Sequence, residues 1–310
     1  MTIAFVFPGQ GAQYVGMGAD LAAHYPEARE VFARASAAAG FDILRLCAEG
    51  PEEALRSTAN TQPAILAASL ACLATLPIEP ACAAGLSLGE YTALVCAGAL
   101  SLEDAVRIVR LRGLFMQEAC AGRDTMMAAV LGLSGDAIAA LCAEHADLGV
   151  VEVSNFNSPG QVVIAGDAAA VRTVLAAARE RGARRAVPLA VSAPFHTSLM
   201  RPAAERLAEH LERVPIQPAR IPVLANVSAA PVRGPAEIRR ALLAQVASPV
   251  RWEQSVRAMH RMRVRLFVEV GPGTVLSGMI RRTVDAETCH VDDRASREAA
   301  LSLLAGRPVT

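Results

Sequence analysis

The sequence has 310 residues, 53% of them hydrophobic, and its 30 basic residues balance 30 acidic ones. A chain of this length can bury a large core, so we expect a globular protein of one large domain with an insertion, or of two modest domains. The zero net charge and the lack of a basic tract argue against nucleic acid as the main partner, because phosphate binding relies on clustered cations.

The first eight residues are apolar but too few to span a membrane, and they lack the charged leader of a signal peptide. We interpret residues 3–7 as a first, buried strand. The seven cysteines are odd in number, scattered and without a Cys-x-x-Cys pair, which favours neither a disulfide framework nor a zinc site. The sequence therefore predicts a cytoplasmic protein without a membrane segment or a bound metal.

Two glycines surround Gln10 directly after this strand. An ordinary turn from strand to helix explains them. The alternative is that they let backbone N–H groups approach a substrate closely, so that Gln10 and Leu88 together form an oxyanion hole. Two segments of helical period follow, at residues 19–39 and 64–76.

The pentapeptide GLSLG at residues 85–89 stands between a short apolar strand, residues 81–85, and a predicted helix, residues 90–100. In a Gly-x-Ser-x-Gly turn the chain passes from strand to helix so tightly that only glycine fits on either side of the serine. Such a nucleophile elbow exposes the Ser87 hydroxyl in a cleft, and the N–H of Leu88 faces a developing oxyanion.

Residues 101–119 form the next predicted helix, and its first residues, SLED, resemble a capping box. From about residue 125 to residue 192 the order of elements becomes strand, helix, strand, strand, helix, strand, which is typical of the ferredoxin-like fold. We predict these elements as strands at residues 126–131, 150–155, 161–165 and 184–191 and helices at residues 136–145 and 168–182.

The rest of the chain alternates short apolar runs with longer helical segments, which predicts an α/β domain with a largely parallel central sheet. After residue 192 we expect a helix at residues 202–213 and strands at residues 223–226 and 265–269. The predicted organisation is therefore a discontinuous large domain of residues 1–124 and 193–310, with a small domain of residues 125–192 inserted into it.

A serine hydroxyl needs a base to take its proton, and the sequence offers six histidines. Four of them lie in helical segments among polar neighbours, where a solvated role is expected, and a fifth lies in the tail. His196 instead follows a predicted strand, where loops of α/β proteins gather active-site groups, although a capping or core histidine is the alternative. No Asp or Glu is evident to orient it, so we predict a dyad whose histidine is held by a backbone carbonyl.

A second loop candidate lies inside the inserted unit, at residues 155–160, with the sequence NFNSPG. It is either a plain turn or a segment that lines the cleft between the two domains, with Asn155 as its first side chain. A cleft between two such bodies is a common place for a ligand.

Taken together, these stretches resemble the malonyl-CoA:acyl carrier protein transacylase family. Seven separated motifs carry the resemblance in order along nearly the whole chain: FVFPGQG at residues 5–11, GLSLGEY at 85–91, RG at 112–113, FNSPGQ at 156–161, PFH at 194–196, SPVRW at 248–252 and EVGPG at 269–273. The resemblance implies an α/β-hydrolase-like large domain with an inserted ferredoxin-like small one, in agreement with the order of elements.

The resemblance also implies the roles of individual residues. Ser87 is the nucleophile that carries the acyl ester, His196 is the base that deprotonates it, and the backbone of Gln245 accepts a hydrogen bond from His196. Arg112 clamps the malonyl carboxylate through two parallel hydrogen bonds, a geometry that lysine cannot copy. From the residues alone, this arginine and its neighbours are expected on a solvated helix face.

Two further positions bear on selectivity and pathway. Phe195 is similar to the malonyl-preferring form of its motif, and its ring crowds a substituent on the α-carbon of the acyl group, although one methyl is worth only about 1–3 kcal/mol. Leu86 departs from the family, which usually has histidine before the serine. In this it is similar to the stand-alone acyltransferases that serve polyketide synthases in trans.

The predicted function is a ping-pong transfer of malonyl from malonyl-CoA, through Ser87, to the phosphopantetheine thiol of an acyl carrier protein of a polyketide synthase. The alternatives are a malonyl transacylase of fatty acid synthesis, an acyl hydrolase that clears stalled groups from carriers, and a catalytically silent subunit that recruits carriers. Malonyl-CoA is the substrate and no bound cofactor is expected. We expect a monomer whose carrier protein is a separate polypeptide.

Overall fold

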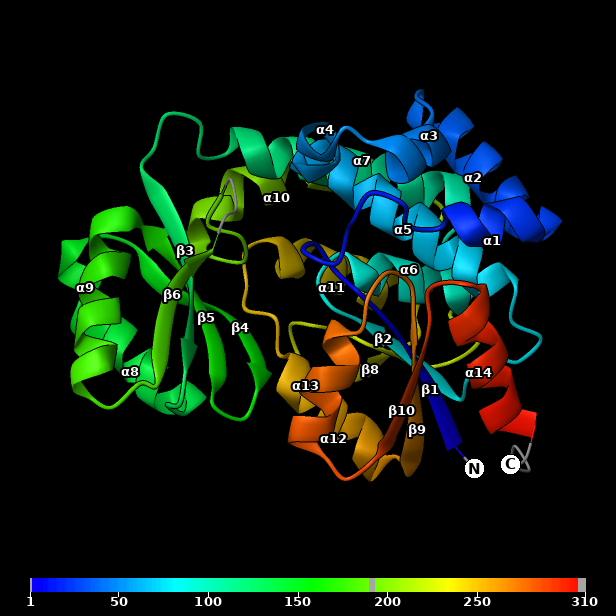
Figure 1. Ribbon diagram of the computed structural model, residues 1–310. Coiled ribbons are helices and arrows are strands. Elements are labelled where there is room, and N and C mark those ends of the chain that lie inside the picture. Colours follow the sequence, from blue (N-terminus) through cyan, green and yellow to red (C-terminus); the bar gives the residue numbers. More distant parts are fainter. Residues whose placement is uncertain (1, 190–192, 306–310) are drawn as a thin grey trace.

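The structure is a computed structural model that describes residues 2–189 and 193–305 (Figure 1). Its main sheet has the strand order β10-β9-β1-β2-β7-β8, and all pairs are parallel except β7 with β8. The strands are β1 (Thr2–Phe7), β2 (Cys82–Gly85), β7 (Val223–Leu224), β8 (Pro231–Val232), β9 (Val264–Val270) and β10 (Glu287–Val291). The predicted α/β fold with a parallel central sheet is confirmed.

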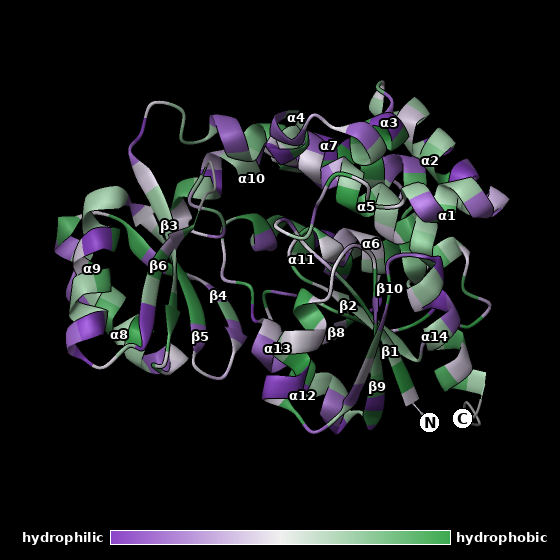
Figure 2. Ribbon diagram, viewed as in Figure 1, coloured by the Kyte–Doolittle hydropathy of each residue, from purple (hydrophilic) through white to green (hydrophobic). Residues whose placement is uncertain are grey.

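Helices cover both faces of this sheet, as the central strand β1 illustrates. Because successive side chains of a strand point to opposite faces, Phe5 and Phe7 pack in one hydrophobic cluster and Ala4 and Val6 in another. The first cluster includes residues of α2 (Pro26–Ala39), α5 (Thr58–Ala74) and α7 (Leu102–Glu118), and the second includes residues of α12 (Trp252–Arg261) and α13 (Val275–Thr283). Figure 2 shows hydrophobic residues along the strands and hydrophilic residues on outward-facing parts of helices such as α12.

The other helices around the main sheet are α1 (Ala19–His24), α3 (Ile43–Glu49), α4 (Glu52–Arg56), α6 (Gly89–Cys96), α10 (Arg201–Leu211), α11 (Pro235–Val246) and α14 (Arg294–Ala305). The predicted cap of α7 is present, since Ser101 Oγ accepts a hydrogen bond from the Asp104 N–H at 3.0 Å. No helix within the described ranges has the length and apolar character that a membrane span requires.

Two predicted helices have different bounds in the structure. The helix expected at residues 19–39 is divided at Tyr25, whose backbone is extended because the next residue is Pro26. The helix expected at residues 64–76 begins at Thr58, and Pro63 lies inside it. In the turn before this proline Thr61 and Gln62 are buried, and the Thr61 hydroxyl donates to the Ser57 carbonyl at 2.9 Å, so these contacts support the helix there.

A second, four-stranded antiparallel sheet forms a lobe beside the first (Figure 1), with the order β4-β5-β3-β6. This order is that of the ferredoxin-like fold, as predicted. Residues 190–192, which include the predicted end of the last strand and of the small domain, lie outside the described residues, and the domain bounds remain predictions. The elements are β3 (Thr125–Leu131), α8 (Gly135–Glu144), β4 (Val151–Ser158), β5 (Gln161–Asp167), α9 (Ala168–Glu180) and β6 (Arg185–Leu189).

Backbone hydrogen bonds join the two lobes next to the expected site. The Phe156 N–H donates to the Val250 carbonyl, and the Val250 N–H donates to the Ser154 carbonyl, both at 2.9 Å. The strand predicted to end at Asn155 continues to Ser158 as β4, because Phe156 and Ser158 also pair with β5, so a plain turn over residues 155–158 is wrong. The asparagines of this motif therefore sit on a strand that faces the large lobe.

Candidate active site

The turn at Ser87 has the tight geometry of an elbow. β2 ends at Gly85, α6 begins at Gly89, and Ser87 itself has a positive φ of 53°. A Cβ atom on Gly85 would lie 1.9 Å from the carbonyl carbon of Gly89, and one on Gly89 would lie 2.1 Å from the Phe7 carbonyl oxygen. No side chain fits at either position, which explains both glycines of the motif.

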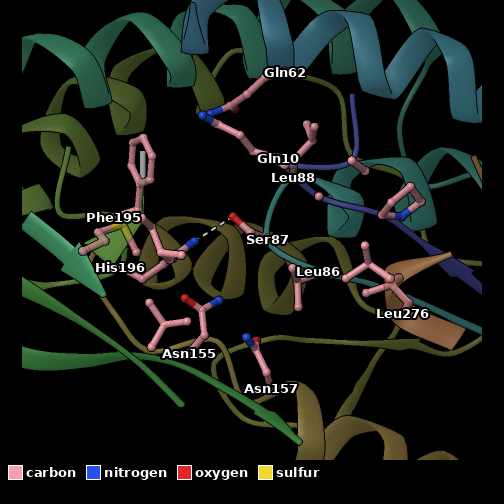
Figure 3. Close-up of a pocket in the computed structure, with 18 of the residues that line it drawn as sticks. Gln10, Gln62, Leu86, Ser87, Leu88, Asn155, Asn157, Phe195, His196 and Leu276 are labelled. Carbon is pink, nitrogen blue, oxygen red and sulfur yellow. Dashed lines mark hydrogen bonds between the residues drawn. The ribbon is translucent and has the colours of Figure 1, made fainter. Parts of the chain in front are cut away.

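His196 contacts the hydroxyl of Ser87 from a position 109 residues along the chain. Ser87 Oγ lies 2.6 Å from His196 Nε2 (Figure 3), and His196 Nδ1 lies 2.8 Å from the carbonyl oxygen of Gln245. A carbonyl oxygen only accepts, so Nδ1 carries the proton and the lone pair of Nε2 is free to accept from the serine. The structure brings together the three groups that were predicted to meet.

Burial keeps this imidazole neutral. His196 is 3% exposed, and its pKa falls from 6.5 to about 3, mainly because burial disfavours the charged form and secondly because the Arg112 cation is near. The hydrogen bond to the Gln245 carbonyl acts in the opposite direction. A neutral imidazole bonded to a serine hydroxyl can take its proton.

Arg112 lies inside the protein, where its guanidinium contacts the same hydroxyl. Its Nη2 donates to Ser87 Oγ and to Gln245 Oε1, both at 2.9 Å, and its Nη1 donates to Gln62 Oε1 at 2.9 Å. The Nε group has no partner among the described residues. The expectation of a solvated face was wrong for this arginine, because α7 turns this side chain into the cavity; Arg107 is exposed, and Arg110 stacks on Phe41.

Glu90 and Asn226, two buried residues behind the nucleophile, were not found by sequence reasoning, and of Gln245 only the backbone carbonyl was expected there. Glu90 Oε2 accepts hydrogen bonds from Gln245 Nε2 at 2.7 Å and from the Asn226 backbone N–H at 3.0 Å. The net pKa of Glu90 is raised to about 7, because the effect of burial exceeds the opposite effect of these two hydrogen bonds and of the Arg112 cation. A glutamate among the apolar residues of the helix after the elbow was the one available signal in the sequence.

The loops that carry Gln10 and Leu88 touch next to Ser87. A Cβ atom on Gly9 would lie 2.4 Å from the Leu86 carbonyl oxygen, so glycine permits this contact. Neither the Gln10 nor the Leu88 backbone N–H donates a hydrogen bond within the part of the chain that the structure describes. Both residues line the cavity, as expected of an oxyanion hole.

Ser87 opens into a cavity of about 220 Å³ between the two lobes. Ligand pockets usually measure about 300–1,000 Å³, so this one suits a short acyl group. Exposed side chains of Leu189 and Val275 form part of its rim. Figure 3 shows Asn155, Asn157 and Phe195 among the residues around Ser87. Further lining residues include Gln62, Leu86, Arg112, Met116, Met127, Val163, His196, Leu276 and Met279.

The described residues contain no cluster of three or more side chains that could hold a metal ion. The seven cysteines are all free, and none lines the cavity. The groups that the cavity presents next to Ser87 are the neutral imidazole of His196, the Arg112 guanidinium and the loops of Gln10 and Leu88.

Comparisons with known proteins find similar sequences over nearly the whole chain. The acyl transferase domain family matches residues 4–303. The malonyl CoA-acyl carrier protein transacylase of Escherichia coli (strain K12) is 48% identical over 305 residues, which cover 97% of this chain and 99% of the relative. The protein of the same name from Bacillus subtilis (strain 168) is 43% identical over 307 residues, 97% of each chain.

Solved structures are similar over the same length. An acyl carrier protein S-malonyltransferase from Vibrio cholerae superposes with a TM-score of 0.94 at 45% identity, covering 97% of this chain and 100% of that one. A malonyl-transacylase solved in complex with a type II polyketide synthase acyl-carrier protein superposes with a TM-score of 0.95 at 44% identity, covering 98% and 100%.

Proposed function

Because this chain belongs to the acyl transferase domain family, we propose that it transfers a malonyl group from malonyl-CoA to the phosphopantetheine thiol of an acyl carrier protein. One observation carries the malonyl assignment. The buried Arg112 guanidinium, which can bind a carboxylate, touches the Ser87 hydroxyl inside a cavity sized for a short acyl group. The names of the similar proteins support the same substrate and acceptor.

In the first half of the reaction, His196 Nε2 takes the proton of the Ser87 hydroxyl, and Oγ attacks the thioester carbonyl of malonyl-CoA. The N–H groups of Gln10 and Leu88 stabilise the resulting oxyanion. The C–S bond then breaks, His196 returns the proton to the departing sulfur, and free CoA leaves behind a malonyl ester on Ser87.

In the second half, the carrier's thiol gives its proton to His196 and attacks the ester carbonyl. The tetrahedral intermediate uses the same oxyanion hole. The C–O bond breaks, Ser87 Oγ recovers the proton from His196, and malonyl leaves as a thioester of the carrier protein. One histidine can serve both halves because the hydrogen bond from its Nδ1 to the Gln245 carbonyl leaves Nε2 free to take up and return a proton.

Arg112 supplies the charge that selects malonyl in this proposal. When the malonyl carboxylate enters, the guanidinium binds it with parallel N–H groups, the geometry for which arginine is suited. Gln62 and Gln245 accept hydrogen bonds from the guanidinium and hold it in place next to Ser87. Asn155 and Phe195 line the remainder of the acyl and thioester path.

For the pathway, we propose a carrier protein of polyketide synthesis, acting as a separate chain. Leu86, which precedes the nucleophile and lines the cavity, and the similarity to a malonyl-transacylase solved with a type II polyketide synthase carrier support this choice. A fatty acid role is the alternative. Loading rates measured with one purified carrier of each kind from the source organism decide between them, since faster loading of the fatty acid carrier would reject the polyketide assignment.

The proposal is tested by incubating the protein with labelled malonyl-CoA and locating the label by peptide mass spectrometry. We expect an ester on Ser87, no ester in Ser87→Ala, and wild-type behaviour in the control Ser101→Ala, whose hydroxyl caps α7 outside the cavity. Normal carrier loading by Ser87→Ala would reject the assignment. An ester that is released to water at the same rate with or without carrier would instead indicate a hydrolase.

A further inference from the structure

The side chain of Asn226 makes the contacts that a neighbouring strand makes elsewhere in the sheet. β2 pairs with β7 on one side, but β7 ends at Leu224. Beyond this end, Asn226 Oδ1 accepts a hydrogen bond from the Ser87 N–H, and Asn226 Nδ2 donates one to the Gly85 carbonyl, both at 2.7 Å. In a parallel ladder, one residue of the neighbouring strand donates its N–H to the carbonyl that precedes a given residue and accepts, with its C=O, from the N–H that follows that residue. The Asn226 carboxamide makes the same two hydrogen bonds before and after Leu86.

This contact meets a need of the elbow. Ser87 has a backbone conformation of positive φ, which costs about 1–3 kcal/mol and persists only when the surroundings hold it. Its N–H is bound by Asn226, and its carbonyl oxygen accepts a hydrogen bond from Gln245 Nε2 at 2.9 Å. Because a peptide unit is planar and trans, fixing the Ser87 carbonyl also turns the Leu88 N–H the opposite way, toward the cavity that Leu88 lines.

Asn226 is itself held in a single orientation. It is completely buried, and its backbone N–H donates to Glu90 Oε2 at 3.0 Å. Its Oδ1 also lies 3.4 Å from Gln245 Nε2, so the carboxamide oxygen faces N–H donors while its nitrogen faces a carbonyl. If the amide were turned around, its NH₂ group would face the Ser87 N–H and its oxygen would face the Gly85 carbonyl. The hydrogen bonds therefore specify that the amide oxygen points to the Ser87 N–H.

We propose that Asn226 is a positioning residue of the transfer reaction, whose carboxamide fixes the peptide units around Ser87 and thereby the aim of its hydroxyl at His196. The inference rests on the proposed transfer through Ser87. It places Asn226 in a step that every acyl group shares, whereas Arg112 acts only on an acyl group with a carboxylate.

Asn226→Ala tests the proposal. We expect the rate of Ser87 acylation to fall about 10- to 100-fold, by the same factor for malonyl-CoA and acetyl-CoA and with little change in KM, because a small misplacement of a nucleophile costs that much. The matched control is Asn60→Ala, which removes a side-chain hydrogen bond to the Ala54 carbonyl at 3.0 Å outside the cavity. Acylation by Asn226→Ala at the wild-type rate, well below its unfolding temperature, would overturn the proposal. A wild-type protein that forms no ester would instead refute the proposed function.

A second variant keeps the shape of the side chain. In Asn226→Asp, an ionised carboxylate can accept from the Ser87 N–H but repels the Gly85 carbonyl, whereas a protonated carboxyl can donate to it. We therefore expect the acylation rate, relative to wild type at the same pH, to rise as the pH falls. Glu90 is the titratable group that contacts Asn226, through the Asn226 backbone N–H, so the same comparison is repeated in a Glu90→Gln background, where this carboxyl no longer titrates. A ratio that does not change with pH would contradict the proposal.

Discussion

The Arg112 guanidinium and the Ser87 hydroxyl are in direct contact, with Nη2 2.9 Å from Oγ. In a malonyl ester a single CH₂ separates the free carboxylate from the ester carbonyl, so a carboxylate clamp must lie this close to the nucleophile. A longer dicarboxylic acyl group would place its carboxylate too far away. The short distance between these two side chains thus matches the length of the proposed substrate.

Arg112→Ala should lower the rate of malonyl loading about 100-fold and that of acetyl loading much less. The reason is that hydrogen bonds to a charged group contribute about 1.5–3 kcal/mol each. Acetyl has no carboxylate, so it makes no such bonds to the guanidinium and loses none in the variant. Stopped-flow or quenched acylation of Ser87 with the two CoA esters measures the ratio. The control is Arg110→Ala on the same helix, whose guanidinium stacks on Phe41 at 4.9 Å. Equal losses for malonyl and acetyl would reject the clamp.

The rate of Ser87 acylation should not fall as the pH is lowered through 6.5. His196 has its pKa lowered to about 3 by burial, so the imidazole stays unprotonated and able to accept the serine proton until the medium is far more acidic. A pH profile of single-turnover acylation checks this, using Glu90→Gln in parallel to identify any step near pH 7 that belongs to Glu90. Half-loss of the rate near pH 6.5 in both proteins would show an ordinary, solvated histidine.

The free energy of unfolding of the wild-type protein should fall relative to that of Glu90→Gln as the pH rises from about 4.5 to about 7. The pKa of Glu90 is raised in the folded state, so across this window the native protein binds more protons than the unfolded chain, and the free energy of unfolding falls with a slope of at most about 1.4 kcal/mol per pH unit. Urea denaturation of both proteins at several pH values gives the difference. Glu49→Gln on the exposed face of α3 serves as the control. If wild type instead became more stable relative to Glu90→Gln as the pH rises, the result would contradict burial of the carboxyl.

The sequence was sufficient to predict the elements that depend on local patterns. The elbow at Ser87, the cap at Ser101 and the order of elements in the second lobe all follow from residues close together in the chain, and the structure contains each of them. The contact of Ser87 with His196 was predicted because a serine needs a base and one histidine stood in a loop. Its partner at Gln245 came only from the family resemblance.

The rest of the site depends on which helix faces turn inward, and local patterns do not show that. Arg112 resembles a surface arginine in the sequence, since its burial depends on the packing of α5 and α7. Asn226 and Glu90 contact each other across 136 residues, through a side chain and a backbone N–H. The predicted strand ended at Asn155 because asparagine favours turns, whereas the pairing of Phe156 and Ser158 with β5 extends it to Ser158.

Gly85→Ala should prevent stable folding or lower the free energy of unfolding by more than about 3 kcal/mol, because its Cβ would overlap the backbone of Gly89. Gly278→Ala, a matched substitution in α13, should instead raise it by about 0.5–1 kcal/mol. There the new methyl meets only the end of Arg282, and alanine favours a helix. Chemical denaturation of the two variants gives the sign of the change in the free energy of unfolding for each. A Gly85→Ala protein as stable as wild type would contradict the tight elbow.

Phe195→Ala should relax the choice of acyl group. The Phe195 ring lines the cavity beside His196. In the proposed reaction the ring crowds the α-carbon of the acyl group, so removing it makes room for a methyl branch. We expect the ratio of methylmalonyl to malonyl loading to rise about tenfold, the amount that one methyl contributes in a hydrophobic site. A competition assay with both CoA esters and one carrier protein measures this ratio.

The control for this prediction separates selectivity from stability. Phe115→Ala removes an equally buried ring on α7 that lies against Arg206 and His210 and does not line the cavity. Both substitutions should destabilise the fold by about 3–5 kcal/mol, since each deletes a buried aromatic side chain. Only Phe195→Ala should change the loading ratio. If both variants shift the ratio alike, the change reflects a loosened fold, and the aromatic ring beside the base does not select the acyl group.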